Sequence, residues 1–230
     1  MTSLCESHEP GFLFSLLRVT SPALPIGAYA YSRGLEHAVH AGWVHDEASA
    51  QAWILGLIEH TVCQLDAPLL LRAYDAWILD DHARVEYLNA WLHASRESHE
   101  LRLEDAQLGA AFARLLVSQR VASAGSWEKR DDACYATLYA LACVRFGIPR
   151  QSALDGFLWG LTEGQTSAAV RLIPLGQTAG QRILSAAIEL LPGCAAQSLA
   201  VTEDEIGATA PAFAIGSALH ETQYTRLFRS

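Results

Sequence analysis

Two histidines three residues apart, His37 and His40, follow Glu36 in a segment with helical periodicity. Side chains at this spacing share one face of a helix, so the pair could contribute two ligands to a metal ion. A protein metal site needs a third and a fourth ligand at fixed spacing, and the other histidines are dispersed and form no H-E-x-x-H motif. We therefore interpret both as surface or boundary residues and predict no metal site.

The sequence contains no recognisable nucleophile or phosphate-binding motif. G-x-S-x-G, the P-loop pattern and a glycine fingerprint after a strand are all absent. Cys134 and Cys143 lie in an apolar helix, where a cysteine usually packs as a small hydrophobe. Glu163, in a glycine-rich helix, is the best candidate for the buried carboxylate of a helical-bundle enzyme, and a surface glutamate is its alternative. We predict no active site and no cofactor, and keep an enzyme with its site around Glu163 as the alternative function.

The elements that carry these residues are helical, because apolar residues recur at helical spacing along most of the chain. Four helix starts are predicted, at Asp46, Asp66, Asp80-Asp81 and Ser98, with Pro68 in the first turn of the second helix. In the fourth helix the pattern predicts inward-facing apolar side chains and three that face water, namely Arg102, Glu104 and Asp105. No long strand alternation is found, so we expect an all-α fold, a single-domain bundle of about ten helices over residues 1–230.

Glycine and proline mark the later helices. Gly147, followed by Ile148 and Pro149, predicts a left-handed helix end. The next helix carries Gly156, Gly160 and Gly164 on one stripe, which predicts close approach of another helix. Pro174 should end this helix, and Pro192-Gly193 should open a looser stretch before a last helix over 211–219.

Composition excludes several classes of function. The 230 residues are 51% hydrophobic and 18% charged with a net charge of −9, which indicates a globular protein and argues against a nucleic-acid partner. No uninterrupted apolar run reaches the roughly 18 residues of a membrane span. The first ten residues lack the basic region of a signal peptide, and the five cysteines are scattered and odd in number. We therefore expect free thiols and a cytoplasmic protein.

The stretch from Ser21 to Glu36 follows the first apolar helix and combines two prolines with apolar side chains. Pro22 and Pro25 must end that helix, because each fixes φ and removes a backbone donor. The irregular segment nevertheless carries Leu24, Ile26, Tyr29 and Tyr31, which are unusual in a solvated linker. Such a segment is either packed under the rest of the fold or offered to a partner.

Four stretches of this chain together resemble the urease accessory protein UreF family. They are Ser21-Pro-Ala-Leu-Pro-Ile-Gly27 with Tyr29-Ala-Tyr-Ser-Arg-Gly-Leu-Glu36, then Ser95-Arg-Glu-Ser-His-Glu100, then residues 165–181, and last residues 220–230. The chain departs from the family pattern at Ala28, where a second glycine is common, and at Ala30, where serine is common. Their order and spacing hold from about residue 12 to the end.

The resemblance implies a non-enzymatic, all-helical scaffold for nickel insertion into urease. Members of the family form homodimers and bind the accessory protein UreD, also called UreH. The pair recruits the GTPase UreG to apo-urease, and a modulation of GTP hydrolysis by UreF has been proposed. The resemblance thus implies UreD/UreH, UreG and apo-urease as partners, with neither a nucleic acid nor a membrane.

Two sets of partner-binding residues follow from the resemblance and from residue type. The tail is predicted to dock onto UreD through aromatic and arginine anchors, Tyr224, Arg226, Phe228 and Arg229. The surface for UreG is predicted to include Tyr29, Tyr31, Ser32, Glu36 and Arg171. Packing in the core beside the proline loop is the alternative role for the two tyrosines. Residues 1–10 and 221–230 are expected to be flexible, with the tail becoming ordered when UreD binds.

Overall fold

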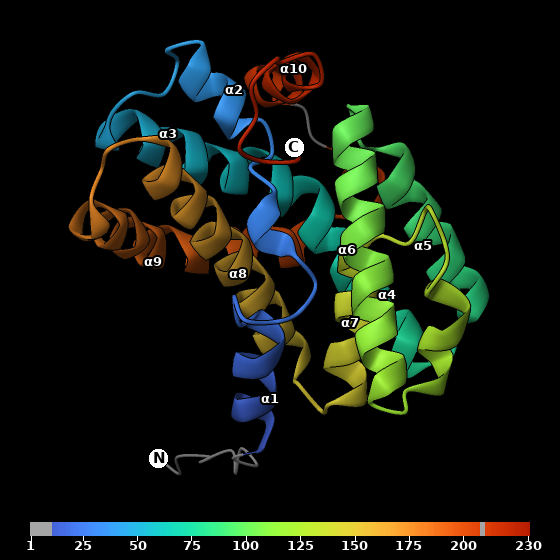
Figure 1. The fold of residues 1–230 in the computed structure, drawn as a ribbon. Helices are drawn as coiled ribbons and strands as arrows, with labels where there is room; N and C mark the ends of the chain where they lie inside the picture. Colours follow the sequence, from blue (N-terminus) through green and yellow to red (C-terminus); the bar gives the residue numbers. More distant parts are fainter. Residues whose placement is uncertain (1–10, 208–209) are drawn as a thin grey trace, which may run out of the picture.

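The computed structural model describes residues 11–207 and 210–230, and all regular structure within them is helical (Figure 1). The ten α-helices are α1 (Gly11–Thr20), α2 (Leu35–His40), α3 (Glu47–Leu57), α4 (Ala67–Ile78), α5 (His82–Ala94), α6 (His99–Ser118), α7 (Tyr135–Arg145), α8 (Arg150–Leu172), α9 (Gln177–Ala200) and α10 (Pro211–His220). The predicted all-α fold of about ten helices is confirmed.

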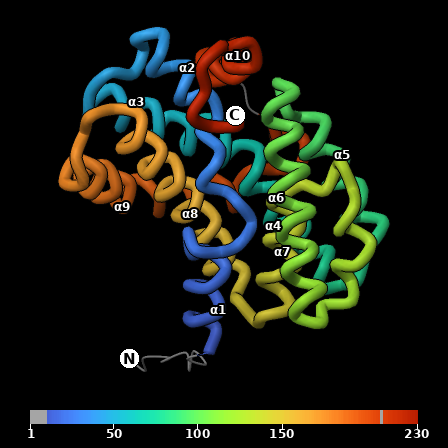
Figure 2. Tube along the Cα trace, in the orientation of Figure 1, coloured from blue at the N-terminus to red at the C-terminus, as the bar shows by residue number. Residues whose placement is uncertain are grey.

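The main core lies between α4, α6 and α7, with α8 beside them. Trp77, Tyr139 and Phe112 are its largest fully buried side chains, and the indole N–H of Trp77 donates to the Thr137 carbonyl at 3.0 Å. Figure 2 shows α3, α8 and α9 together on one side of the molecule and α4 to α7 on the other. Above them, α2 and α10 pack against each other, and the chain returns there at its C-terminus (Figure 1).

Three of the four predicted helix starts are confirmed by side-chain caps. The carboxylate of Asp46 accepts the Ser49 N–H at 2.8 Å, that of Asp81 accepts the Arg84 N–H at 3.0 Å, and the Ser98 hydroxyl accepts the Leu101 N–H at 3.1 Å. These bonds satisfy N–H groups that a helix start leaves without a partner.

The predicted helix start at Asp66 is wrong. The chain continues from α3 through π-helical turns over Ile58–Asp66 directly into α4. Pro68 has no N–H to donate, and the Gln64 carbonyl four residues earlier accepts the Gly207 N–H at 3.2 Å instead. Asp66 is buried there and accepts from Arg96 at 2.6 Å.

The predicted loose stretch at Pro192-Gly193 is also wrong, because α9 runs through both residues to Ala200. Both residues are exposed, so water can satisfy the carbonyl that Pro192 leaves without a donor. The predicted end of α8 before Pro174 is confirmed, since the helix stops at Leu172.

The glycines of α7 and α8 have different roles. Gly147 has a φ of +66°, and the Ile148 N–H donates to the Cys143 carbonyl at 2.9 Å, which confirms the left-handed helix end. At Gly156 a Cβ atom would lie 2.5 Å from the Leu16 side chain, so α1 does approach closely there. No such approach occurs at the other two stripe positions. The nearest atom to a Cβ at Gly160 is 3.9 Å away, and none lies within 4 Å at Gly164.

Cys63, Cys134, Cys143 and Cys194 are free and buried, as predicted for thiols that pack as small hydrophobes, while Cys5 lies outside the described residues. Two helical stretches, Glu47–Ile78 and Gln177–Ala200, have the length and average hydropathy of a membrane span. The first is 72% buried inside the fold and is a core helix. The second packs on α8 and exposes Arg182 and Glu189, so neither is a clear span.

Candidate partner-binding site

The proline stretch turns one tyrosine outward and the other inward. Gly27, at a φ of +81°, begins a single 3₁₀ turn over Ala28–Ala30. Tyr29 on this turn is 72% exposed, whereas Tyr31 is 8% exposed and its hydroxyl donates to the Gln107 amide oxygen. The core-packing alternative therefore describes Tyr31, and Tyr29 remains available to a partner.

The C-terminal tail returns to this stretch and forms backbone bonds with it. The Arg229 N–H donates to the Ala30 carbonyl at 2.8 Å. The Ser32 N–H and the Ser32 hydroxyl both donate to the Ser230 carbonyl oxygen at 2.6 Å. Residues almost two hundred positions apart are therefore joined by main-chain hydrogen bonds.

Glu36 fixes the tail to α2. Its buried carboxylate accepts the backbone N–H groups of Leu227 at 2.6 Å and Phe228 at 2.8 Å, and the His220 Nε2 lies 3.2 Å away. A carboxylate that accepts several hydrogen bonds is well satisfied although it is buried. Glu36 thus cannot contact a partner in this conformation, and its role is to hold the tail.

Glu100, at the start of α6, provides a second anchor for the same segment. Its two oxygens lie 2.7 Å from the His220 Nδ1 and 2.7 Å from the Arg226 guanidinium. His220 is fully buried, and each of its ring nitrogens faces a different carboxylate. The imidazole ring therefore bridges α2 and α6 at the end of α10.

Glu104 and Asp105 are buried, so the prediction that they face water is wrong. Glu104 accepts from the Arg33 Nε and the Ser230 hydroxyl, each at 2.7 Å. Asp105 accepts from the Arg96 Nε at 2.8 Å and from the Tyr135 N–H at 2.7 Å. Burial alone would raise the pKa of Asp105, but the Arg96 guanidinium and the Tyr135 N–H lower it. These carboxylates occupy the inner face of α6 because each is paired.

Arg171, from α8, joins the loop to the tail. Its guanidinium donates to the Tyr29 carbonyl at 3.0 Å, and its central carbon lies 4.5 Å from the ring centroid of Phe228. The Phe228 ring is buried beside α2 and α8.

The nine predicted partner-binding residues thus come from three distant segments that the fold brings to one face. Five of them are exposed, namely Tyr29, Arg171, Tyr224, Arg226 and Arg229. The other four are buried, namely Tyr31, Ser32, Glu36 and Phe228. We call the five exposed residues the tail–loop surface. The buried four hold this surface in place and do not themselves face solvent.

In this structure the tail packs on its own chain, since Phe228 and Ser230 are buried, and its expected flexibility stays a prediction. Acceptors supplied by Glu36, Glu100 and Glu104 bond the tail without a partner. Sequence reasoning did not assign a role to Glu100, Glu104 or His220. Glu100 and His220 lie inside the stretches that resemble the family, and only this resemblance could have indicated a role for them. Residues 1–10, which we expect to be flexible, lie outside the described residues.

The histidine pair His37 and His40 lies in α2, and its surroundings bear on the possibility of a metal site. The rings of His37 and His40 are 6.4 Å apart, and His37 packs edge-on against Trp43 at 5.5 Å. Residues 11–207 and 210–230 contain no group of three His, Cys, Asp or Glu side chains that could hold a metal ion.

Comparison with known proteins identifies the family. A family model described as UreF matches residues 44–188. A urease accessory protein UreF of Alkalilimnicola ehrlichii is 46% identical over 215 residues, with 94% of each chain covered. The protein named urease accessory protein UreF 2 of Brucella anthropi is 45% identical, with 97% of this chain and 99% of its own covered.

The chain belongs to the UreF family. A role in urease maturation follows from the family, and it is an accessory role, as the names of the relatives state. The family model stops short of both the proline stretch and the tail, but the two relatives cover nearly the whole chain.

Proposed function

We propose that this UreF protein is a non-catalytic scaffold that, together with UreD (UreH), recruits the GTPase UreG to apo-urease for nickel insertion. It acts in the cytoplasm as a homodimer and modulates GTP hydrolysis by UreG. Membership of the UreF family and the accessory role named for its relatives support the proposal.

The observation that carries this proposal is the convergence of the loop, α8 and the tail on one face. Tyr224 is fully exposed and Tyr29 is 72% exposed, although aromatic side chains this large are usually buried. Tyrosine and arginine are the residue types enriched among the anchors of protein interfaces. Buried hydrogen bonds of Ser32, Glu36 and Glu100 hold the segments that carry these side chains, which lowers the cost of ordering them when a partner binds.

The charge of the surface also favours a protein partner with an acidic patch. The chain carries a net charge of −9, yet all three charged members of the tail–loop surface are arginines. Glu100 balances Arg226, which leaves Arg171 and Arg229 as cations without a carboxylate partner among the described residues. Charge complementarity of this kind contributes mainly to specificity and to the rate of association.

Within the surface we assign Tyr224, Arg226 and Arg229 to UreD, and Tyr29 and Arg171 to UreG. The test of the UreG assignment is a pull-down of the UreF–UreD pair with UreG. Tyr29→Ala and Arg171→Ala should each weaken UreG recruitment at least tenfold, while UreD still co-purifies. Tyr87→Ala is the matched control, since Tyr87 is an exposed tyrosine on α5. Unchanged recruitment by both test variants would contradict the assignment.

The alternative function, an enzyme with a site around Glu163, has one observation in its favour and one against it. Glu163 lies in the wall of a cavity, and burial raises its pKa. The other carboxylate of that wall, Glu104, is already engaged by Arg33 and Ser230. Glu163 therefore has no second free carboxylate in that wall to share acid and base roles with it, and the family membership makes the scaffold the better-supported function.

A further inference from the structure

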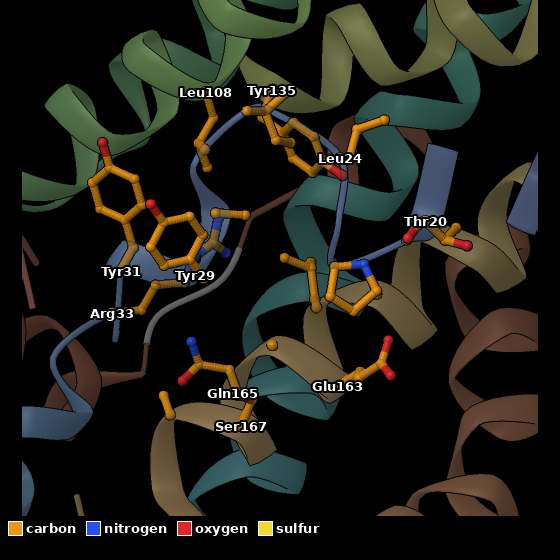
Figure 3. A pocket seen from close by; sticks show the side chains of 18 of the residues that line it. Thr20, Leu24, Tyr29, Tyr31, Arg33, Leu108, Tyr135, Glu163, Gln165 and Ser167 are labelled. Atoms are coloured by element: carbon orange, nitrogen blue, oxygen red, sulfur yellow. The ribbon is translucent and has the colours of Figure 1, made fainter. Parts of the chain in front are cut away.

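A cavity of about 200 Å³ lies beneath the proline stretch, between α1, α8 and the start of α7 (Figure 3). We propose that this cavity is a binding site for a compact, uncharged aromatic or aliphatic small molecule that carries an N–H or O–H donor. The proposal rests on the cavity and not on the proposed partners, although Tyr29 and Arg171 of the tail–loop surface also line the cavity.

Two glycines of α8 keep the cavity open. Gly160 and Gly164 both line it, and neither has a neighbour that a Cβ atom would displace. Glycine destabilises a helix interior relative to alanine, and close helix packing accounts only for Gly156. The space beside these two glycines is therefore not required by the packing of the chain itself.

A buried amide in the wall has no partner. Gln165 is 4% exposed, and its Oε1 is buried with no hydrogen bond to any described residue. Buried polar atoms of this kind are nearly always bonded, so this acceptor calls for a donor from outside the chain. Figure 3 shows the Gln165 side chain reaching into the cavity from the same helix as Glu163.

The other residues of the cavity wall indicate the chemical class of the small molecule that would bind. Leu24, Ile26, Leu108 and Tyr135 provide apolar and aromatic walls. Of the four charged wall residues, Arg33 and Glu104 are paired with each other at 2.7 Å, and the formal charges of Glu163 and Arg171 cancel, so the wall carries no net charge. A cavity of roughly 150 Å³ with apolar walls can hold benzene, so this one has room for a single substituted ring. The Gln165 oxygen requires that the substituent be a donor.

Phenol and toluene are matched probes, because they have nearly the same shape and only phenol carries a donor. NMR titration of the full chain should show phenol shifting the amide resonances of Ser167 and Ala168, with weaker binding of toluene. Gln165→Leu should weaken phenol binding about tenfold and leave toluene binding within about threefold. Equal loss of both probes, or no loss of phenol binding, would overturn the assigned role of Gln165.

A second pair of variants tests the cavity itself. Gly164→Leu should fill its mouth and abolish phenol binding, while the melting temperature is kept or raised. Gly193→Leu is the matched control, since Gly193 is a helical glycine on α9 with no neighbour within 4 Å of an added Cβ. It should raise the melting temperature similarly and leave binding intact. Failure of the wild-type protein to bind phenol, or undiminished binding by Gly164→Leu, would overturn the proposal.

Discussion

The buried side chains in the two halves of the molecule differ in polarity. Between α4 and α7 the interior is apolar, with Trp77, Tyr139 and a set of leucines and alanines fully buried. Where α2, α6 and α10 meet the tail, a connected set of buried carboxylates with their arginine, histidine and backbone donors lies beside a smaller apolar cluster that includes Leu35 and Phe228. The apolar half supplies the stability of the bundle through burial of surface.

The polar half gives less net stability, because removing charges from water offsets much of their attraction. Its main contribution is to fix the positions of the segments that meet there. Each carboxylate has fixed donors, and together they determine where the tail, α10 and the proline stretch lie relative to each other. A scaffold that presents residues from three distant segments needs this positional control on one face only. The two halves therefore divide stability and placement between them.

The largest effect should come from removing the cation at the centre of the polar half. Arg96→Ala leaves the buried carboxylates of Asp66 and Asp105 without their guanidinium, and should cost about 3–5 kcal/mol of unfolding free energy. Urea unfolding at pH 7 measures it. Arg182→Ala removes an exposed arginine from its pair with Glu47 and should change stability little. Equal effects of the two variants would contradict the distinction between buried and exposed pairs.

A smaller effect is expected for the anchor of the tail. Phe228→Ala should cost at most about 3 kcal/mol, the lower end for such a truncation, because the tail can open without unfolding the core. Hydrogen exchange should show loss of protection at the amides of Leu227 and Phe228, while those of α7 stay protected. Phe14→Ala, at an exposed phenylalanine of α1, should leave both regions unchanged. Loss of protection throughout the bundle would show that the tail is part of the main core.

The glycine stripe of α8 should respond in opposite directions at its two ends. Gly156→Ala places a methyl group against Leu16 and Thr20 and should cost about 1–3 kcal/mol. Gly164→Ala meets no neighbour and should stabilise the protein by about 0.5–1 kcal/mol. Thermal unfolding of the two variants measures both changes. Destabilisation by both would mean that α8 is packed closely along the whole stripe.

Lowering the pH should destabilise the polar half, because its buried carboxylates become protonated, and should leave the apolar half largely unaffected. Because the pKa of Asp105 is lower in the folded chain than in the unfolded one, its contribution to stability is fully present above about pH 5. The contribution is lost as the pH falls below about 4 and approaches the lowered pKa. Urea unfolding of the wild type at pH 7 and at about pH 3 should show this loss, and Asp105→Asn should show a smaller change. An identical pH response of the variant would contradict the role of Asp105.

Much of the apolar half could be predicted from the sequence, and much of the polar half could not. Periodic apolar residues marked most helices, and local signals at Asp46, Ser98 and Gly147 marked their ends. A charged residue on an inward face looks the same in sequence as one that faces water, so Glu104 and Asp105 were misplaced. Their partners Arg33 and Arg96 lie in the connections before α2 and before α6, and only the tertiary fold sets these pairs.

In the candidate site, too, the sequence did not predict the contacts between distant segments. The family signature pointed to segments that the fold brings together on one face, but residue type alone did not separate the exposed Tyr29 from the buried Tyr31. The tail was expected to be flexible because terminal segments usually fray. Its acceptors, Glu36 and Glu100, are provided by helices far away in the sequence, and no local pattern shows that pairing.

The central claim is that the exposed tail residues bind UreD, and co-purification of UreD with the double variant Tyr224→Ala/Arg229→Ala tests it most directly. Both side chains are exposed, so the fold should be retained, as circular dichroism and an unchanged melting temperature would verify. We predict at least a tenfold loss of UreD from the double variant and full retention by Tyr87→Ala. Retention of UreD by the double variant at the wild-type level would contradict the account.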